Sequence, residues 1–172
     1  MSKTKRLTLC AILIALALAL SYTERFIPLQ MVIPLPGVKL GLANIVTVFA
    51  VFMLGPVEAV LILTCRIFLG AVFAGNFSSI FYSAAGGAVS ILVCIGLAKL
   101  LTGKQIWVAG CLGAVSHSVG QMIMAILLTG TPGLAVYLPV MVVCSIFSGT
   151  FTGLCAQFLV NRGEKLWKTS FK

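Results

Sequence analysis

The sequence predicts an all-α integral membrane protein with six transmembrane helices in a single domain, residues 1–172. Hydrophobic residues make up 60% of the chain and charged residues only 9%, whereas soluble domains carry about a quarter charged residues. The mean hydropathy is +1.17. The apolar stretches are also about 20 residues long, which is the length of helix that crosses a bilayer core. Together these observations exclude a water-soluble monomer.

The spans are separated where proline, glycine or charge interrupts an apolar run. The first span is expected to stay in the protein, because Ser21 to Arg25 offers no small-residue cleavage site. Three prolines between residues 28 and 37 forbid a regular helix before the second span, and Gly55 and Pro56 end that span. The six predicted spans cover about residues 7–26, 38–54, 57–74, 79–101, 106–128 and 134–160.

The basic residues predict that both termini are cytoplasmic. With six spans the two tails share a side, and the connection between the fourth and fifth spans joins them there. That side would carry Lys3, Lys5, Arg6, Lys99, Lys104, Arg162, Lys165, Lys168 and Lys172, and the other side only Arg25 and Lys39. Short loops rich in Lys and Arg stay in the cytoplasm. The chain is therefore expected to be a multi-pass protein of the cytoplasmic membrane.

Two stripes of small residues indicate close helix packing, because small side chains let helix backbones approach within a membrane. The first span carries Ala11, Ala15 and Ala19 at intervals of four residues, and the sixth carries Ser145, Gly149 and Gly153. Packing within the protein explains such stripes simply. The alternative is a docking face for a partner subunit, for which the alanine stripe is the better candidate.

Ionisable side chains inside a span usually face a cavity and mark function. Arg66 lies near the middle of the third span, and His117 near the middle of the fifth with Gln121 one turn further on. No carboxylate stands close to Arg66 in the sequence. Its planar guanidinium, which carries several N–H donors, therefore favours an anionic or carbonyl-rich ligand. Two simpler interpretations remain open: an Arg66 side chain that snorkels or caps carbonyls, and a neutral His117 bonded to a neighbouring helix.

Uncharged polar residues form a predicted outer rim above this group. They are Asn44, Asn76, Ser79 and Tyr82. Turn and cap chemistry explains the Asn and Ser residues equally well, and Tyr82 suits an interfacial anchor. With the rim, the deep residues Arg66, His117 and Gln121 predict a substrate pocket that opens outward under the proline-rich segment.

Catalysis is not expected from this chain. It contains no Asp, only three carboxylates, and no phosphate-binding, zinc-protease or serine-hydrolase motif. Its six Cys residues lie in apolar runs without metal-ligand spacing, so neither a metal site nor a disulfide framework is predicted. The net charge of +9 builds no basic face, which argues against nucleic acid as a partner.

Three runs resemble a known family. They are IPLPGVKLGLAN at residues 33–44, CRIFLG at 65–70 and GNFSS at 75–79. They are similar to the bacterial Gx transporter family, also described as heptaprenyl diphosphate synthase component I, over nearly the whole chain. That family is similar in size and hydropathy to the six-helix S components of energy-coupling factor (ECF) vitamin transporters.

The resemblance implies a substrate-capture subunit that takes a small vitamin-like solute from outside and moves it across the membrane. A flavin (riboflavin, FMN or FAD) is the implied ligand, and an ECF transmembrane coupling subunit with its ATPases is the implied partner. Ala11, Ala15 and Ala19 match the docking stripe of S components, and residues 28–37 match their gating loop. The alternatives are a non-catalytic accessory of a prenyl diphosphate synthase and a structural subunit of a redox or transport complex.

Overall fold

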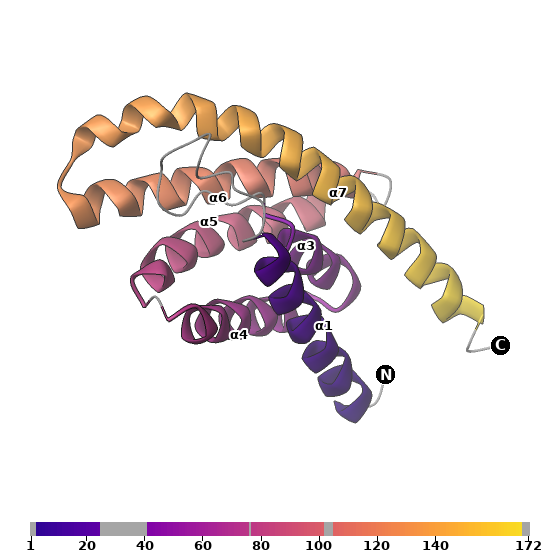
Figure 1. Ribbon diagram of the computed structural model, residues 1–172. Helices are drawn as coiled ribbons and strands as arrows, with labels where there is room; N and C mark the ends of the chain where they lie inside the picture. Colours follow the sequence, from indigo (N-terminus) through magenta and orange to yellow (C-terminus); the bar gives the residue numbers. More distant parts are fainter. Residues whose placement is uncertain (1–2, 25–40, 76, 102–104, 170–172) are drawn as a thin grey trace.

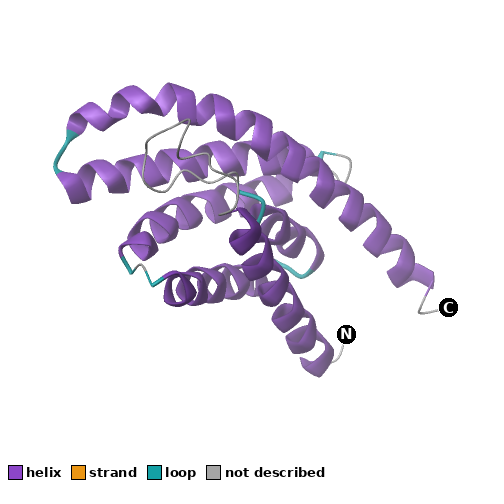
Figure 2. Cartoon of the chain, viewed as in Figure 1, coloured by secondary structure: helices purple, strands orange, loops and turns teal. Residues whose placement is uncertain are grey.

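The computed structural model describes residues 3–24, 41–75, 77–101 and 105–169, with side chains up to Gly163. All regular structure within these ranges is helical, as Figure 2 shows. By length and composition, five helices in the described part of the chain could cross a membrane. The elements are α1 (Lys3–Thr23), α3 (Asn44–Met53), α4 (Pro56–Ala74), α5 (Ser78–Leu100), α6 (Ile106–Thr129), the 3-10 helix η2 (Pro132–Tyr137) and α7 (Leu138–Thr169).

Three of the predicted spans agree with the structure to within one residue at each end. They are the spans that correspond to α4, α5 and α6. Pro56 begins α4, where its fixed φ suits the first turn and its missing N–H costs nothing. Gly75 and Gly130 end α4 and α6 in the left-handed conformation, with φ of 62° and 63°. The same glycine and proline signals are readable in the sequence, so these ends could be predicted.

The second predicted span is wrong in length. Helix α3 has 10 residues and begins at Asn44, although the prediction covers residues 38–54. Gly41 adopts a φ of 76° and starts a turn that leads into the helix. Ten residues rise about 15 Å, roughly half of a hydrocarbon core. The structure thus has five candidate spanning helices and one short apolar helix in its described part, and six full-length spans are not present there.

The first and sixth spans also differ from the prediction. Helix α1 covers Lys3–Thr23, earlier than the predicted residues 7–26, of which 25 and 26 lie outside the described residues. The sixth span begins as η2, because Pro132 and Gly133 favour a tight turn over an α-helix, and α7 then continues to Thr169.

Helices α5, α6 and α7 pack side by side in succession, and α3 contacts α4, α5, α6 and α7. Figure 1 shows α7 as the long helix that runs the length of the molecule, while the start of α1 and the end of α7 lie at the same end. That both termini lie on one side of the membrane, and that this side is cytoplasmic, stays a prediction.

The ion pair between Arg6 and Glu58 holds the start of α1 against the α3–α4 connection. Arg6 Nη1 lies 3.2 Å from Glu58 Oε1, and Arg6 Nη2 donates to Leu54 O at 3.1 Å. Glu58 is therefore engaged at this end of the bundle. Its ion pair in the described structure is with Arg6 and not with Arg66.

The two small-residue stripes have different roles. Gly149 and Gly153 are buried in α7 against α6, and a Cβ on Gly149 would lie 2.6 Å from Ala114 Cβ. The alanine stripe of α1 is exposed along its whole length, whereas Cys10, Leu13 and Ala17 form the buried face of that helix. Packing within the described protein therefore explains the α7 stripe and is wrong for the α1 stripe.

Candidate functional site

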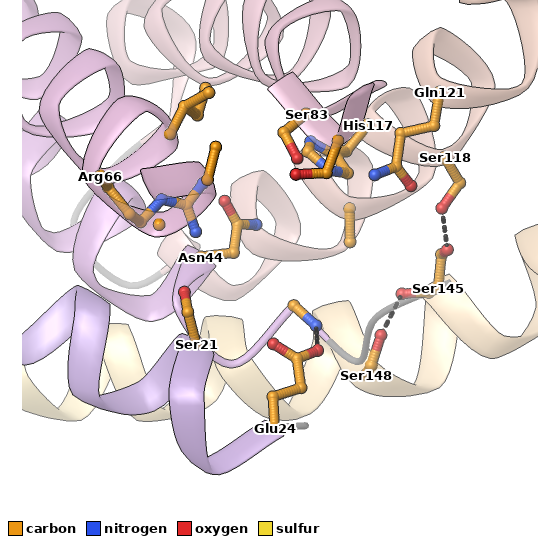
Figure 3. Close-up of a pocket in the computed structure, with 16 residues that line it drawn as sticks. Ser21, Glu24, Asn44, Arg66, Ser83, His117, Ser118, Gln121, Ser145 and Ser148 are labelled. Atoms are coloured by element: carbon orange, nitrogen blue, oxygen red, sulfur yellow. Dashed lines mark hydrogen bonds between the residues drawn. The ribbon is translucent and has the colours of Figure 1, made fainter. Parts of the chain in front are cut away.

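A polar cavity lies between the helices. The volume open to the centre of a water molecule is about 90 Å³, several times the roughly 10–15 Å³ that one ordered water needs. Helices α1, α3, α4, α5, α6 and α7 all contribute to its wall, and Figure 3 shows their side chains around this space. The polar side chains of the wall are Ser21, Glu24, Asn44, Arg66, Ser79, Ser83, His117, Ser118, Gln121, Ser145 and Ser148.

The structure brings five of the seven predicted substrate residues together in this wall. They are Arg66, His117, Gln121, Asn44 and Ser79. Tyr82 is half-buried on α5 and is not among the described residues that line the cavity, so its place in the rim stays a prediction. Asn76 lies outside the described residues, as does the proline-rich segment that was expected to cover the pocket.

Glu24 is the main residue that sequence reasoning missed. Its carboxylate is only 6% exposed and lines the same cavity as Arg66, with which it interacts electrostatically. Glu24 Oε1 also accepts a hydrogen bond from the backbone N–H of Gly41, which lies just before α3. The prediction that Arg66 has no carboxylate nearby is therefore wrong. The two residues are 42 positions apart in the sequence, and only the fold brings them together.

Two hydrogen-bond donors in the wall have no partner among the described residues. They are Arg66 Nε and Asn44 Nδ2, and both atoms are buried. An unmade hydrogen bond at a buried donor costs about 1–3 kcal/mol. Native structures rarely leave such groups unsatisfied without an ordered water or a ligand. Both donors therefore need an oxygen or nitrogen atom inside the cavity as hydrogen-bond acceptor.

The crossing of α5 and α6 positions His117 and Gln121. Gly86 of α5 is buried against them, and a Cβ on Gly86 would lie 2.7 Å from Gln121 Cγ and 2.8 Å from His117 O. Only glycine allows this approach. Between α6 and α7, the Ser118 and Ser145 hydroxyls lie 2.5 Å apart, and Ser145 Oγ donates to Met141 O one turn earlier in α7 at 2.7 Å. Contacts of α6 with both α5 and α7 thus fix this part of the wall.

The arrangement suits recognition better than bond chemistry. Donors and acceptors surround a small space, and no group of three or more His, Cys, Asp or Glu that could hold a metal ion occurs in the described residues. Ionisable side chains at membrane depth are costly unless they serve a pathway or a bound molecule. Within the described residues, the cavity is thus equipped to bind a small molecule with several hydrogen-bonding groups.

One comparison with known proteins identifies a family. The model of the family described as heptaprenyl diphosphate synthase component I matches residues 13–159. No match to the chain was found among curated proteins or among solved structures. The match includes every described residue of the cavity wall from Ser21 to Ser148.

The match covers far more than half of the chain. It confirms the family that the sequence resembles, while the similarity to ECF S components stays a prediction. This family is a non-catalytic component, so the prediction that the chain is not an enzyme is confirmed. Because the family model matches residues 13–159, the chain belongs to the heptaprenyl diphosphate synthase component I family.

Proposed function

We propose that this protein is a non-catalytic membrane subunit that binds a small polar molecule in the cavity around Arg66. The observation that carries the proposal is the pair of buried donors without a described partner, Arg66 Nε and Asn44 Nδ2, in one wall. A bound molecule with carbonyl, carboxylate or ring acceptors would satisfy both. The protein fold then supplies the ligand's hydrogen bonds at a depth where bulk water does not.

The transport form of this proposal has the protein capture the molecule from outside and deliver it across the membrane. A flavin (riboflavin, FMN or FAD) is one candidate cargo, because its ring carbonyls present acceptors to a guanidinium. The exposed stripe of Ala11, Ala15 and Ala19 supports a docked partner such as an ECF coupling subunit with its ATPases. Small residues on an outward face allow a second helix to approach closely.

The family match supports a second candidate function. The printed family description names a component of heptaprenyl diphosphate synthase, so this chain would act as a membrane accessory of a prenyl-elongating enzyme. Five long apolar helices would hold such an assembly at the bilayer, where its product partitions. In this role the exposed alanine stripe would dock a synthase subunit, and the cavity would serve the assembly.

Both candidate functions require a small molecule in the cavity around Arg66, and retention of that molecule during purification tests this requirement. The protein is purified in a mild detergent and denatured, and the extract is examined by absorbance and mass spectrometry. We expect a stoichiometric small molecule from wild type and its loss from Arg66→Ala. Arg162→Ala is the matched control, because Arg162 is exposed on α7 and stacks on Phe158 outside the cavity. Equal retention by Arg66→Ala, or an empty wild-type extract, would contradict the proposal.

Partner capture separates the two candidates. Mildly solubilised native membranes that contain tagged protein are assayed for an ATPase module and for prenyl diphosphate synthase activity. Co-purified chain-elongating activity supports the synthase role, whereas co-purified ATPases and ligand uptake by cells support transport. Recovery of neither partner, together with no bound molecule, would favour a purely structural subunit.

A further inference from the structure

The start of α1 and the last part of α7 meet at one end of the helix bundle. Near the start of α1, Arg6 contacts Leu54 and Glu58 at the connection between α3 and α4. On α7, a Cβ on Gly163 would lie 3.1 Å from Met53 Cε at the end of α3. Because Met53 and Leu54 are consecutive residues, α1 and α7 approach the same point of the fold.

The start of α6 belongs to this end as well. The backbone N–H of Trp107, in the first turn of α6, donates to Gln157 Oε1 of α7 at 3.3 Å. Helix α5 ends shortly before, at Leu100. Trp side chains favour the boundary between acyl chains and lipid head groups, and the Trp107 side chain is 39% exposed. The edge of the membrane's apolar core is therefore expected near this level.

Helix α7 continues past this level. It passes the start of α6 at Gln157 and the end of α3 at Gly163, and it ends at Thr169. The stretch from Gly163 to Thr169 rises about 9 Å, and the head-group layer on each side of a bilayer is roughly 5–8 Å thick. The last turns of α7 thus cross the depth at which the phosphate groups of lipids lie.

This end of the bundle carries a strong excess of positive charge. The exposed basic side chains among its described residues are Lys3, Lys5, Arg6, Lys99 and Arg162. Glu58 is the only acidic side chain described there, and it pairs with Arg6. Outside the described side chains, the adjoining sequence adds Lys104, Lys165, Lys168 and Lys172 against one acid, Glu164. The third acid of the chain, Glu24, lies in the cavity wall and leaves this excess unchanged.

Arg162 shows why such a side chain suits a lipid head group. Its guanidinium lies over the exposed ring of Phe158, with Cζ 5.5 Å from the ring centroid. Phe158 is one turn earlier in α7, so the pair joins an apolar surface to a positive charge. Stacking on a ring leaves the N–H groups at the edge of a guanidinium directed at oxygen acceptors. The phosphodiester groups of lipids present such oxygens together with a negative charge.

We propose that this end of the bundle binds the head groups of anionic phospholipids, with Lys99 and Arg162 among the contacts. A lipid surface fits better than an acidic protein, because the charges lie where the helices leave the apolar core and beside exposed apolar residues such as Phe158. Each basic residue near a membrane surface strengthens the attraction to anionic lipid severalfold. The proposal does not depend on a ligand in the cavity.

The chain's own tryptophans supply the probe. There are two, Trp107 and Trp167, so a Trp167→Phe protein fluoresces from Trp107 alone. This protein is reconstituted in phosphatidylcholine bilayers, and quenching by dibrominated phosphatidylglycerol is compared with quenching by dibrominated phosphatidylcholine. We expect at least about threefold tighter binding of phosphatidylglycerol around Trp107 at low salt. The preference should nearly vanish in about 1 M NaCl, where the Debye length is about 3 Å.

A matched pair of double variants makes the result specific. Lys99→Gln with Arg162→Gln removes two charges from this end and should reduce the preference by at least about half. Arg25→Gln with Lys39→Gln removes two charges that the sequence predicts on the other side of the membrane, and should leave it unchanged. Equal binding of both lipids by the Trp167→Phe protein would overturn the proposal and favour an acidic protein as the partner. An equal loss in the two double variants would also overturn it.

The salt dependence covers a Lys99→Gln, Arg162→Gln protein that does not fold, because it is measured with every charge in place. A preference for phosphatidylglycerol that persists at high salt would not arise from charge and would overturn the proposal. Failure of the proposed function is separate, because it appears as an empty extract or as unchanged ligand retention by Arg66→Ala. Neither of those results alters the quenching of Trp107 by anionic lipid.

Discussion

Gly86 of α5 and Gly120 of α6 cross so closely that a Cβ on Gly120 would lie 3.0 Å from Gly86 Cα and 2.9 Å from Ala85 O. The crossing lies directly beside His117 and Gln121, which are also the nearest neighbours of Gly86. The cavity wall therefore includes a very close crossing of α5 and α6. A change in packing at this point is also a change in the site.

Gly86→Ala should damage both stability and ligand binding. The new Cβ would overlap Gln121 Cγ and His117 O, and overpacking of this kind costs about 1–3 kcal/mol. We expect a lower Tm and at least a severalfold loss of retained ligand. Gly96→Ala is the matched control, because Gly96 lies on the same helix with nothing within 4 Å of its Cβ position. Equal behaviour of the two variants would show that the crossing does not position the wall.

Ser145→Ala should weaken the contact between α6 and α7 in the cavity wall. The substitution removes the acceptor for Ser118 Oγ as well as the hydrogen bond to Met141 O. A lost hydrogen bond of this type costs about 1 kcal/mol. Melting temperatures of Ser118→Ala, Ser145→Ala and the double variant give the coupling energy between the two hydroxyls. Strict additivity would mean that the two hydroxyls do not support each other.

Ala15→Leu should impair a partner-dependent activity without unfolding the protein. Ala15 lies in the centre of the exposed stripe on α1, so a larger side chain meets lipid in the isolated protein and a neighbouring helix in an assembly. We expect an unchanged Tm and unchanged ligand retention, with loss of uptake or of synthase co-purification. Ala88→Leu on the exposed face of α5 is the control. Full activity of Ala15→Leu would exclude the stripe as a docking face.

Glu58→Gln should destabilise the protein only slightly. The Arg6 side chain is 49% exposed and the Glu58 side chain 19%, and ion pairs of this exposure contribute about 0–1 kcal/mol. Arg6 also keeps its hydrogen bond to Leu54 O. Equilibrium unfolding in detergent measures the change. A loss of several kcal/mol would show that this end of the bundle depends on the ion pair.

Local signals in the sequence predicted most of the helices. Pro56, Gly75 and Gly130 act through their own backbone restrictions or freedom, so their effects can be read without knowledge of the fold. The break before α3 was harder to predict. The segment from Leu40 to Ala43 is apolar, and hydropathy does not separate an apolar turn from an apolar helix.

The site could be predicted only in part for a related reason. Arg66, His117 and Gln121 are conspicuous because polar residues are costly in apolar runs. Glu24 stood at the end of a span, where a charged residue is ordinary, and its approach to Arg66 depends on the packing of α1 against α4. Seven polar residues of the wall are Ser or Gln, which are common in membrane helices. Their convergence is a tertiary property that no local pattern encodes.

The residues that line the cavity come from the first helix to the last, and this has a consequence for biosynthesis. Its first polar residue is Ser21 near the start of the chain, and its last is Ser148 on the final helix. No partly inserted chain can therefore contain a complete binding site. A cell that supplies the ligand would stabilise only fully assembled molecules, so ligand availability would act as a late quality check on insertion and set how much protein accumulates in the membrane.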